Sequence, residues 1–359
     1  MNFIFDLEYD VKKSKIKSME NIRARVTSEH KGSYKVINEN GEFLAKITGK
    51  QMFTAKSRED YPAVGDWVII DELPENQAII KSILPRQSII KRKYGDKNNI
   101  GEKSDIQVIA VNIDIAFIVQ SLGRDYNLNR FERYFAILGN CIKPVIILNK
   151  IDLITKQELD EILSQIKNRF SDIDVILTST FVDNGLLQLQ NYLQSGKTYC
   201  FLGSSGVGKS SIINKLLGKD LIKTDIISSY SDRGKHITTT RQMYFLQNGA
   251  IVIDNPGIRE VGLANTGEVL DNLFDKINEL SLKCKFNDCT HTQETSCMVL
   301  KAVNAGEIDG KQYQNYLNLK KEFDFYQMSE IEKREKERDF GKFIKKAKKD
   351  LKNYQHKNY

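Results

Sequence analysis

The chain has 359 residues, 40% of them apolar and 28% charged, which fits a globular protein of two or three domains. No apolar run is long enough to cross a bilayer, and the opening residues MNFIFDLEYDVKK lack the pattern of a signal peptide, so we expect a cytoplasmic protein without membrane contact. The net charge is +7, and residues 333–359 alone carry eleven Lys or Arg against four Asp or Glu. The basic excess therefore lies in the C-terminal tail. This favours a polyanionic partner, although a solvated helix end has the same composition.

Residues 22–83 alternate short apolar runs with turn residues, which predicts several strands that close into a small barrel. The segment YKVINENGEFLAKI predicts a hairpin around Asn40-Gly41, and VGDWVII and AIIKSIL predict two further strands. Residues 84–105 are polar, basic and interrupted by glycine, and this composition predicts a linker. We therefore assign residues 1–104 to a first domain, the barrel with its linker.

A different pattern begins at Ile106. The runs IAFIVQ, PVIILNK, DVILTST, TYCFLG and AIVIDNPG are short and apolar, and helical stretches separate most of them. This alternation predicts a parallel sheet with helices on both faces. We assign residues 105–264 to this central α/β domain, and residues 265–359, which are helical and charged, to a third domain.

The segment GSSGVGKS matches the phosphate-binding pattern G-x-x-x-x-G-K-[ST]. It follows an apolar strand and opens a helix, so that backbone N–H groups and the helix N-terminus can hold phosphates. Lys209 is expected to reach the β- and γ-phosphates and to assist catalysis, and the hydroxyl of Ser210 is expected to ligate Mg²⁺. The residues expected to surround the phosphates are Gly203, Ser204, Ser205, Gly206, Val207, Gly208, Lys209, Ser210 and Ser211.

A base-reading motif comes before the phosphate loop. The tetrapeptide NKID ends an apolar strand, and a carboxylate there can accept hydrogen bonds from N1–H and the exocyclic amine of guanine. Asp152 would thus select GTP, Asn149 would hold the base, and Lys150 would lie along the ring. Ser179 and Thr180 are expected to support the base through their backbone N–H groups. Alone, the tetrapeptide fits a helix start equally well, but together with the phosphate loop it indicates a GTPase.

Two further segments lie where a γ-phosphate sensor is expected. The segment DNPG resembles the D-x-x-G element, with Asp254 near Mg²⁺ and the N–H of Gly257 on the γ-phosphate. The segment DRGKHITTTRQ is expected to supply Thr238 as a switch ligand of Mg²⁺, although a threonine-rich surface loop would look alike. Ile258 occupies the position at which many GTPases carry a water-positioning Gln. We expect His236 to orient the water instead, although a loop histidine is often incidental.

The motifs run in the order base reader, base support, phosphate loop, switch and D-x-x-G. This is a circular permutation of the order in most GTPases. The sheet can be the same, because neighbouring chain ends can be rejoined elsewhere. After Gly257 the chain then leads into the C-terminal region instead of into the next strand of the sheet.

Three of the five cysteines cluster with a histidine near the C-terminus. The four residues are Cys284, Cys289, His291 and Cys297. Three thiolates and one imidazole form a closed set suited to one structural Zn²⁺. Three reduced core cysteines are the alternative, but their neighbours, KFNDCTHTQETS, are polar, which favours the metal. Cys141 and Cys200 lie in or beside apolar strands, where ordinary packing is expected.

These motifs, in this order, resemble those of RsgA, the family of GTPases that depend on the small ribosomal subunit. The resemblance covers nearly the whole chain and rests on PAVGDWV, NKIDL, GSSGVGKSSIINKL, GKHITTT, DNPGIRE and CKFNDCTHTQETSC. It implies an oligonucleotide-binding (OB) barrel, a circularly permuted GTPase and a zinc domain. It also implies a GTP hydrolase that binds the small subunit and its rRNA, assists late maturation and is stimulated by the subunit. The switch reads HITTT where the family usually has HTT, so Ile237 leaves Thr238 as the Mg²⁺ candidate.

Basic and aromatic side chains in the tail suit the phosphates and unpaired bases of RNA. The competing hypothesis is a nucleic-acid-binding module in which the nucleotide is structural and hydrolysis is incidental. The set of Lys209, Ser210 and Asp254 favours the enzyme, because a structural pocket needs no Mg²⁺ and γ-phosphate apparatus. We expect the protein to act as a monomer.

Overall fold

The structure, a computed structural model, describes residues 22–30, 32–94, 105–123, 126–222, 241–255 and 267–329, with part of 331–347. Contacts divide the chain into two compact units, Met1–Gly262 and Leu263–Tyr359. The expected division into three domains stays a prediction. Within the described ranges, every helix is too short or too polar to span a bilayer.

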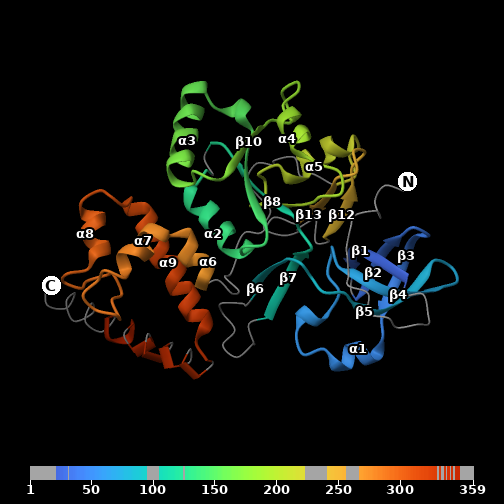
Figure 1. Cartoon of the computed structure of the whole chain (residues 1–359), viewed down its shortest axis with the longest axis horizontal. Coiled ribbons are helices and arrows are strands. Elements are labelled where there is room, and N and C mark those ends of the chain that lie inside the picture. Colours follow the sequence, from blue (N-terminus) through green and yellow to red (C-terminus); the bar gives the residue numbers. More distant parts are fainter. Residues whose placement is uncertain are drawn as a thin grey trace, which may run out of the picture. The chain divides into compact units, whose positions relative to one another are not determined.

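Five strands of the first unit close into the predicted barrel (Figure 1). They are β1 (Ile22–His30), β2 (Ser33–Asn38), β3 (Gly41–Ile47), β4 (Trp67–Leu73) and β5 (Gln77–Ile83). The order is β1-β2-β3-β5-β4, and β4 returns to pair with β1. All neighbours are antiparallel except β3 and β5. The barrel is OB-like, as expected.

Alternating side chains build the barrel core. In β2 and β3 every second side chain points inward. The buried residues of these two strands include Tyr34, Val36, Phe43 and Ala45. The hairpin lies one residue earlier than expected: Asn38 pairs with Gly41, so Glu39 and Asn40 form the turn. The side-chain oxygen of Asn38 accepts a hydrogen bond from the N–H of Asn40 (2.9 Å), which stabilises the turn at this position.

A short helix, α1 (Gly49–Thr54), and a 3₁₀ turn, η1 (Arg58–Asp60), connect β3 to β4. Thr48 and Gln51 form a reciprocal cap at the start of α1: each side chain accepts a hydrogen bond from the backbone N–H of the other (3.2 Å each). The cap satisfies two otherwise unpaired donors and explains why so short a helix begins here.

Part of the expected linker is a strand, so that expectation is wrong. β6 (Ile89–Tyr94) pairs antiparallel with β7 (Asp105–Val111) in a separate two-stranded sheet. Two of its basic residues have partners, because Lys91 pairs with Glu59 (3.1 Å) and Arg92 donates to Gln107 (2.9 Å). Ile90, the second residue of β6, is fully buried. The charges that suggested a linker are therefore compatible with a paired strand.

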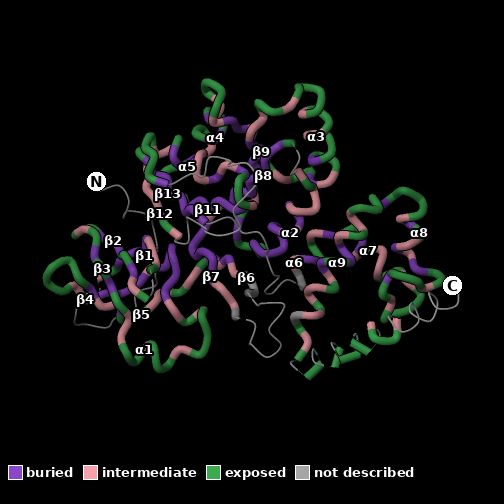
Figure 2. Tube along the Cα trace, turned by 180° about the vertical axis from the view of Figure 1, so that it is seen from behind, coloured by how far each residue is buried: buried purple, intermediate pink, exposed green. Residues whose placement is uncertain are grey.

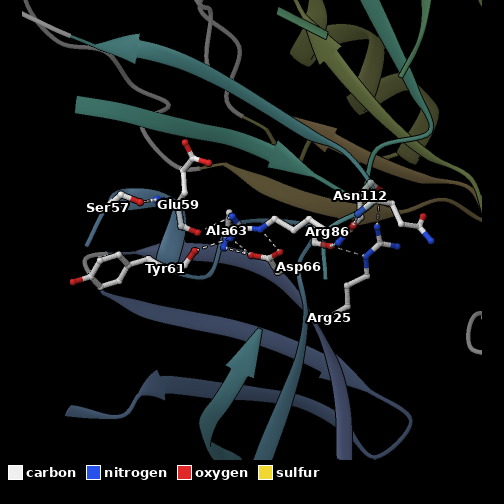
Figure 3. Close-up of polar contacts among 10 residues, drawn as sticks. Arg25, Ser57, Glu59, Tyr61, Ala63, Asp66, Arg86 and Asn112 are labelled. Atoms are coloured by element: carbon white, nitrogen blue, oxygen red, sulfur yellow. Dashed lines mark hydrogen bonds and ion pairs between the residues drawn. The ribbon is translucent and has the colours of Figure 1, made fainter. Parts of the chain in front are cut away.

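Arg86, near the start of the same segment, is the centre of a buried polar cluster (Figure 3). Its guanidinium forms a two-pronged ion pair with Asp66 (2.7 and 2.8 Å). It also donates to the backbone carbonyls of Glu59 and Tyr61 (2.7 and 2.8 Å). Asp66 is fully buried and accepts a further hydrogen bond from the N–H of Ala63 (2.7 Å). The cluster holds the loop between η1 and β4, because each buried charge has several partners.

Arg25 of β1 joins the barrel to the α/β part of the unit. Its guanidinium donates to the hydroxyl of Thr198 (2.9 Å) and to the carbonyls of Asn112 (3.2 Å) and Gly65 (3.4 Å). It also lies over the ring of Trp67, 5.2 Å from the ring centroid. Burial lowers the pKa of Arg25 to about 10. A desolvated cation at this position requires all of these contacts, so they tie the barrel to the start of a sheet strand.

The α/β part contains the predicted sheet (Figure 1). Its strands are β8 (Ile115–Ser121), β9 (Lys143–Asn149), β10 (Asp174–Thr178), β11 (Thr198–Leu202), β12 (Gln242–Phe245) and β13 (Ile251–Asp254). The order is β10-β9-β8-β11-β13-β12, parallel except for β12. One residue pair, Ser28 with Gln242, continues the sheet into barrel strand β1.

Helices accompany these strands, as expected. They are α2 (Leu128–Leu138), α3 (Lys156–Arg169), α4 (Leu187–Tyr192) and α5 (Lys209–Leu217), with a 3₁₀ turn, η2 (Ile151–Leu153). In the core, the ring of Phe117 lies 5.1 Å from that of Tyr199 and 5.0 Å from that of Phe201. A buried ion pair between Glu132 and Arg169 (2.7 Å) links α2 to the end of α3.

The second unit is helical, as expected. Its helices are α6 (Gly267–Leu273), α7 (Asp275–Ser281), α8 (Met298–Asn304) and α9 (Gly310–Gln327). Phe274 and Tyr316 pack edge to face with ring centroids 5.3 Å apart, and Val299 and Leu319 are fully buried. This core is small, so other contacts must contribute to its stability.

Candidate nucleotide and metal sites

The phosphate loop connects β11 to α5, and its glycines are required by their surroundings. Gly203 has a φ of +152°, and a Cβ there would lie 2.4 Å from the carbonyl oxygen of Val119 in β8. Gly208 has a φ of +96°, and its Cβ would lie 2.3 Å from Nδ2 of Asn149. Atoms of β8 and of the base-reading motif thus occupy the space that any larger side chain would need. Glycine at these two positions lets the loop lie close to both elements.

Lys209, the first residue of α5, points back into the loop. Its ammonium donates to the carbonyls of Gly203 and Ser204 (2.8 Å each), and only 6% of the residue is exposed. Burial lowers the pKa of Lys209 to about 8, and the nearby carboxylate of Asp254 opposes this effect. The lysine is therefore a desolvated cation whose charge an anion would stabilise.

Ser210 and Asp254 meet at the carboxyl end of β13. Their side-chain oxygens are 3.5 Å apart. Asp254 is buried, burial raises its pKa to about 6, and its Oδ1 has no hydrogen-bond partner among the described residues. A hydroxyl and a buried carboxylate oxygen without a donor are the hard oxygen ligands that Mg²⁺ prefers, so these residues fit the expected ion.

The base-reading motif is tied directly to the phosphate loop. Asn149, at the end of β9, is buried and donates to the carbonyl of Val207 (2.9 Å), and its oxygen accepts from Thr178 (3.0 Å). Lys150 has a left-handed backbone (φ +62°) and donates to the carbonyl of Gly206 (2.8 Å). Segments more than fifty residues apart in the sequence therefore form one site.

Asp152 lies in η2 with its carboxylate at the surface. One carboxylate oxygen accepts a hydrogen bond from the hydroxyl of Ser179, which in turn accepts from the N–H of Phe181 (3.1 Å). The N–H of Ser179 donates to the carbonyl of Gly185 (3.0 Å), so it is already engaged and differs from the expected free donor. The hydroxyl of Ser179, and not its N–H group, is therefore the group in contact with the carboxylate of Asp152. Thr180 is the next residue and is half-buried.

The remaining residues predicted for the nucleotide site are either exposed to different degrees or outside the described part of the chain. Ser205 is exposed, and Ser211 is half-buried in the first turn of α5. His236, Thr238 and Gly257 lie outside the described residues. Their predicted roles stay predictions.

Two polar contacts, one with the loop and one with the preceding strand β11, were not found from the sequence. Tyr134 of α2 shares a hydrogen bond with the side chain of Ser204, and burial raises its pKa. The amide of Asn255 donates to the sulfur of Cys200 (2.9 Å), and its buried oxygen has no partner within the described part of the chain. Tyr134 has the pattern of an ordinary core position of an amphipathic helix, so the sequence carries no signal for its contact.

Cys200 is buried in β11, as expected, and burial raises the pKa of its thiol. The expectation that Cys141 is packed is wrong, because this residue is exposed. It follows α2 and precedes β9, so the nearby apolar strand does not cover it.

The four predicted zinc ligands converge in the second unit. Ligand atoms of Cys284, Cys289, His291 and Cys297 all lie within 4.8 Å of one another. The two sulfur atoms of Cys284 and Cys297 are 3.8 Å apart, and they lie 3.6 and 3.5 Å from Nδ1 of His291. Atoms bound tetrahedrally to Zn²⁺, with Zn–S near 2.3 Å, are separated by about 3.8 Å. The cluster thus has the dimensions and the donor set for one zinc ion.

Neighbouring residues fix these ligands. His291 is 3% exposed and has a left-handed backbone (φ +61°), its carbonyl accepts a hydrogen bond from Tyr313 (2.5 Å), and burial lowers its pKa. The N–H of Leu300 donates to the sulfur of Cys297 (3.4 Å), at the start of α8. Glu294 accepts from the hydroxyl and the N–H of Thr290 (2.6 and 2.8 Å), which lowers the pKa of the carboxyl group. The loop that carries the ligands is therefore held in shape by its own polar contacts.

Known proteins match this chain over most of its length. The family model of the RsgA GTPase matches residues 83–264. Small ribosomal subunit biogenesis GTPase RsgA 1 of Bacteroides thetaiotaomicron is 40% identical over 344 residues, which are 95% of this chain and 94% of that protein. Small ribosomal subunit biogenesis GTPase RsgA 2 of Lactiplantibacillus plantarum is 41% identical over 323 residues, 89% of each protein. The chain belongs to the RsgA GTPase family.

Solved structures show the same fold for this RsgA chain. YjeQ from Thermotoga maritima has a TM-score of 0.58 and 24% identity, over 86% of this chain and 99% of that one. YloQ, described as a circularly permuted GTPase, has a TM-score of 0.56 and 22% identity, over 86% of this chain and 96% of that one. The expected permuted fold is thus confirmed, and membership of the RsgA family makes the chain a GTP-hydrolysing enzyme.

Proposed function

We propose that this RsgA GTPase binds the small ribosomal subunit through rRNA, assists its late maturation and hydrolyses GTP faster when the subunit is bound. The relatives that match almost the whole chain carry the name small ribosomal subunit biogenesis GTPase. The observation that supports the enzymatic part best is the pair of hydrogen bonds from Asn149 and Lys150 to the phosphate loop, because it unites base reader and phosphate loop in one site.

In this proposal the phosphate loop binds the triphosphate through its backbone N–H groups and through Lys209. The ammonium of Lys209 lies on loop carbonyls beside the start of α5, where phosphate oxygens would stabilise its charge. Ser210 and Asp254 would hold Mg²⁺, with Thr238 as a further ligand. When bound, the ion neutralises charge that develops on the phosphate oxygens.

Asp152 would select guanine. Its carboxylate accepts hydrogen bonds from the two donors on the base edge, and adenine offers no such pair. The hydroxyl of Ser179 donates a hydrogen bond to one oxygen of this carboxylate and would fix the orientation of the group. Lys150, held by the carbonyl of Gly206, would cover one face of the ring.

The remaining parts of the proposal concern water, metal and RNA. His236 would orient the attacking water in place of the glutamine of other GTPases. The Cys₃His cluster would bind one Zn²⁺ and stabilise the second unit, whose core is small. The basic tail and the barrel would contact rRNA phosphates and bases, with the protein acting as a cytoplasmic monomer.

The experiment that tests the function is GTP turnover by the full chain with and without purified small subunits. We expect slow release of phosphate alone and a marked increase with subunits. Lys209→Ala should abolish both rates, which shows that the turnover belongs to this site. Turnover that subunits leave unchanged would contradict the proposal and favour a module in which the nucleotide is structural.

A further inference from the structure

Helix α1 of the barrel exposes large apolar side chains. Phe53 is 92% exposed, its neighbour Met52 is 59% exposed, and no residue of the helix is buried. Figure 2 shows the helix almost entirely in the colour of exposed residues. Packing within the described part of the chain therefore does not explain a phenylalanine at this position.

The attachment of α1 determines which of its faces points outward. The side chain of Gln51 donates to the carbonyl of Lys81 in β5 (2.8 Å), so Gln51 faces the barrel. Successive helical residues are rotated by about 100°, which puts Phe53 about 160° and Lys50 about 100° from Gln51 in the same direction. Lys50 and Phe53 therefore share the face that points away from the barrel.

The segment that contains this helix is rich in basic residues. Between residues 44 and 58 there are four basic residues and no acidic one, and all four are exposed and form no ion pair with another described residue. The four are Lys46, Lys50, Lys56 and Arg58. Of the next two residues, both acidic, Glu59 pairs with Lys91, and Asp60 accepts from the N–H groups of Lys56 and Ser57 (2.8 and 2.9 Å) and keeps its negative charge, so basic residues remain in excess.

We propose that this outer face of α1 is a contact surface for unpaired nucleotides of RNA. Phe53 is the platform on which a base stacks, and Lys50 contacts the adjoining phosphate. An exposed flat ring beside an exposed lysine, in a segment where basic residues are in excess, suits single-stranded RNA, which offers aromatic faces and one negative charge per nucleotide. An acidic protein would satisfy the charge but would not require a flat ring. The inference rests on the proposed function in that small-subunit rRNA is the natural source of these nucleotides.

Two probes test the surface in the full-length protein: purified small subunits and a labelled single-stranded RNA dodecamer of mixed sequence. We expect Phe53→Ala and Phe53→Leu to weaken binding of both by roughly 5- to 100-fold, and Phe53→Tyr to stay within about twofold of the wild type, because only a ring can stack. Lys50→Gln should lower the slope of log affinity against log salt by about 0.7–0.9. Lys167→Gln, which removes an exposed lysine of α3, is the control and should change nothing.

The outcomes separate this inference from the proposed function. If the wild type binds both probes and Phe53→Ala binds them equally well, the surface is refuted and the ribosomal function stands. If the wild type binds the dodecamer but not the subunits, the ribosomal function fails and the surface is judged on the dodecamer.

Two results would refute RNA as the ligand of this surface. A Phe53→Leu variant that binds both probes as tightly as the wild type would refute stacking in favour of an apolar protein contact. A change in oligomeric state on Phe53→Ala would refute RNA in favour of a second copy of the chain. Thermal unfolding checks that the variants fold. Because Phe53 is exposed, we expect its substitution to leave the melting temperature unchanged.

Discussion

One added methyl group in the phosphate loop should disconnect the base reader. Gly208 has a φ of +96°, and a Cβ there would lie 2.3 Å from Nδ2 of Asn149. Gly208→Ala therefore forces the asparagine aside and breaks its hydrogen bond to the carbonyl of Val207 (2.9 Å). Gly206 of the same loop has a φ of +82°, but its Cβ would meet no atom within 4 Å. Gly206→Ala is therefore the matched control, because it adds backbone strain without the collision.

Backbone strain and a broken hydrogen bond determine how much each variant loses in binding free energy. Alanine in a left-handed conformation costs on the order of 1–2 kcal/mol, and both variants carry this cost. Gly208→Ala also leaves buried polar groups of Asn149 and Val207 unpaired, which adds about 1–3 kcal/mol. If this strain falls on the conformation that binds nucleotide, GDP affinity should drop roughly 5- to 30-fold in Gly206→Ala and roughly 30- to 4000-fold in Gly208→Ala.

Calorimetric titration of GDP into both variants and the wild type measures the difference. Thermal unfolding of each protein, followed by circular dichroism, verifies that the loop variants are folded. Equal losses of affinity in the two variants would refute the reasoning, because they would show that the contact of Asn149 with the loop does not contribute to binding.

Asp152→Asn should weaken GTP binding by roughly 10- to 1000-fold and strengthen xanthosine triphosphate binding, because an amide replaces two acceptors by one acceptor and one donor; competition between the two nucleotides measures this, and an unchanged preference would refute it. Metal analysis should find one zinc ion per chain, and Cys297→Ser should lower both the zinc content and the melting temperature, whereas the exposed Cys141→Ser should alter neither. Arg169→Met removes the two hydrogen bonds (2.7 Å each) from the guanidinium to the buried carboxylate of Glu132 and should lower the free energy of unfolding by about 1.5–3 kcal/mol in urea titration. An unfolding free energy equal to that of the wild type would contradict the explanation.

The sheet, the barrel and the phosphate loop were predictable because each depends on local pattern. Continuous apolar runs such as PVIIL are buried on both faces and become β9, and the alternating runs of residues 33–47 become a half-buried hairpin. The glycines of the phosphate loop are required by close contacts with Val119 and Asn149, and these contacts are the reason why the motif has its spacing.

Strand β6 was not predictable, because its stability comes from partners distant in the sequence. Lys91 and Arg92 look like linker residues until Glu59 and Gln107 lie beside them. The hydroxyl of Ser179 on Asp152 is a contact of the same kind, since no local pattern specifies it. Sequence patterns thus located the site, while long-range hydrogen bonds decided how its side chains are oriented.

The reversed order of the motifs leaves the site intact, because the site is defined by the order of strands in the sheet. β9 and β11 both lie beside β8 and are parallel to it, so their carboxyl ends meet at one edge. There Asn149 and Lys150 bond to Val207 and Gly206, although the base reader comes first in the chain. Permutation changes only which parts of the chain precede and follow the sheet. The barrel precedes the sheet and contacts the start of β11 through Arg25, and the chain beyond Gly262 belongs to the helical second unit. The RNA contact that we propose on the barrel would therefore act on a body that shares buried hydrogen bonds with the strand leading into the phosphate loop.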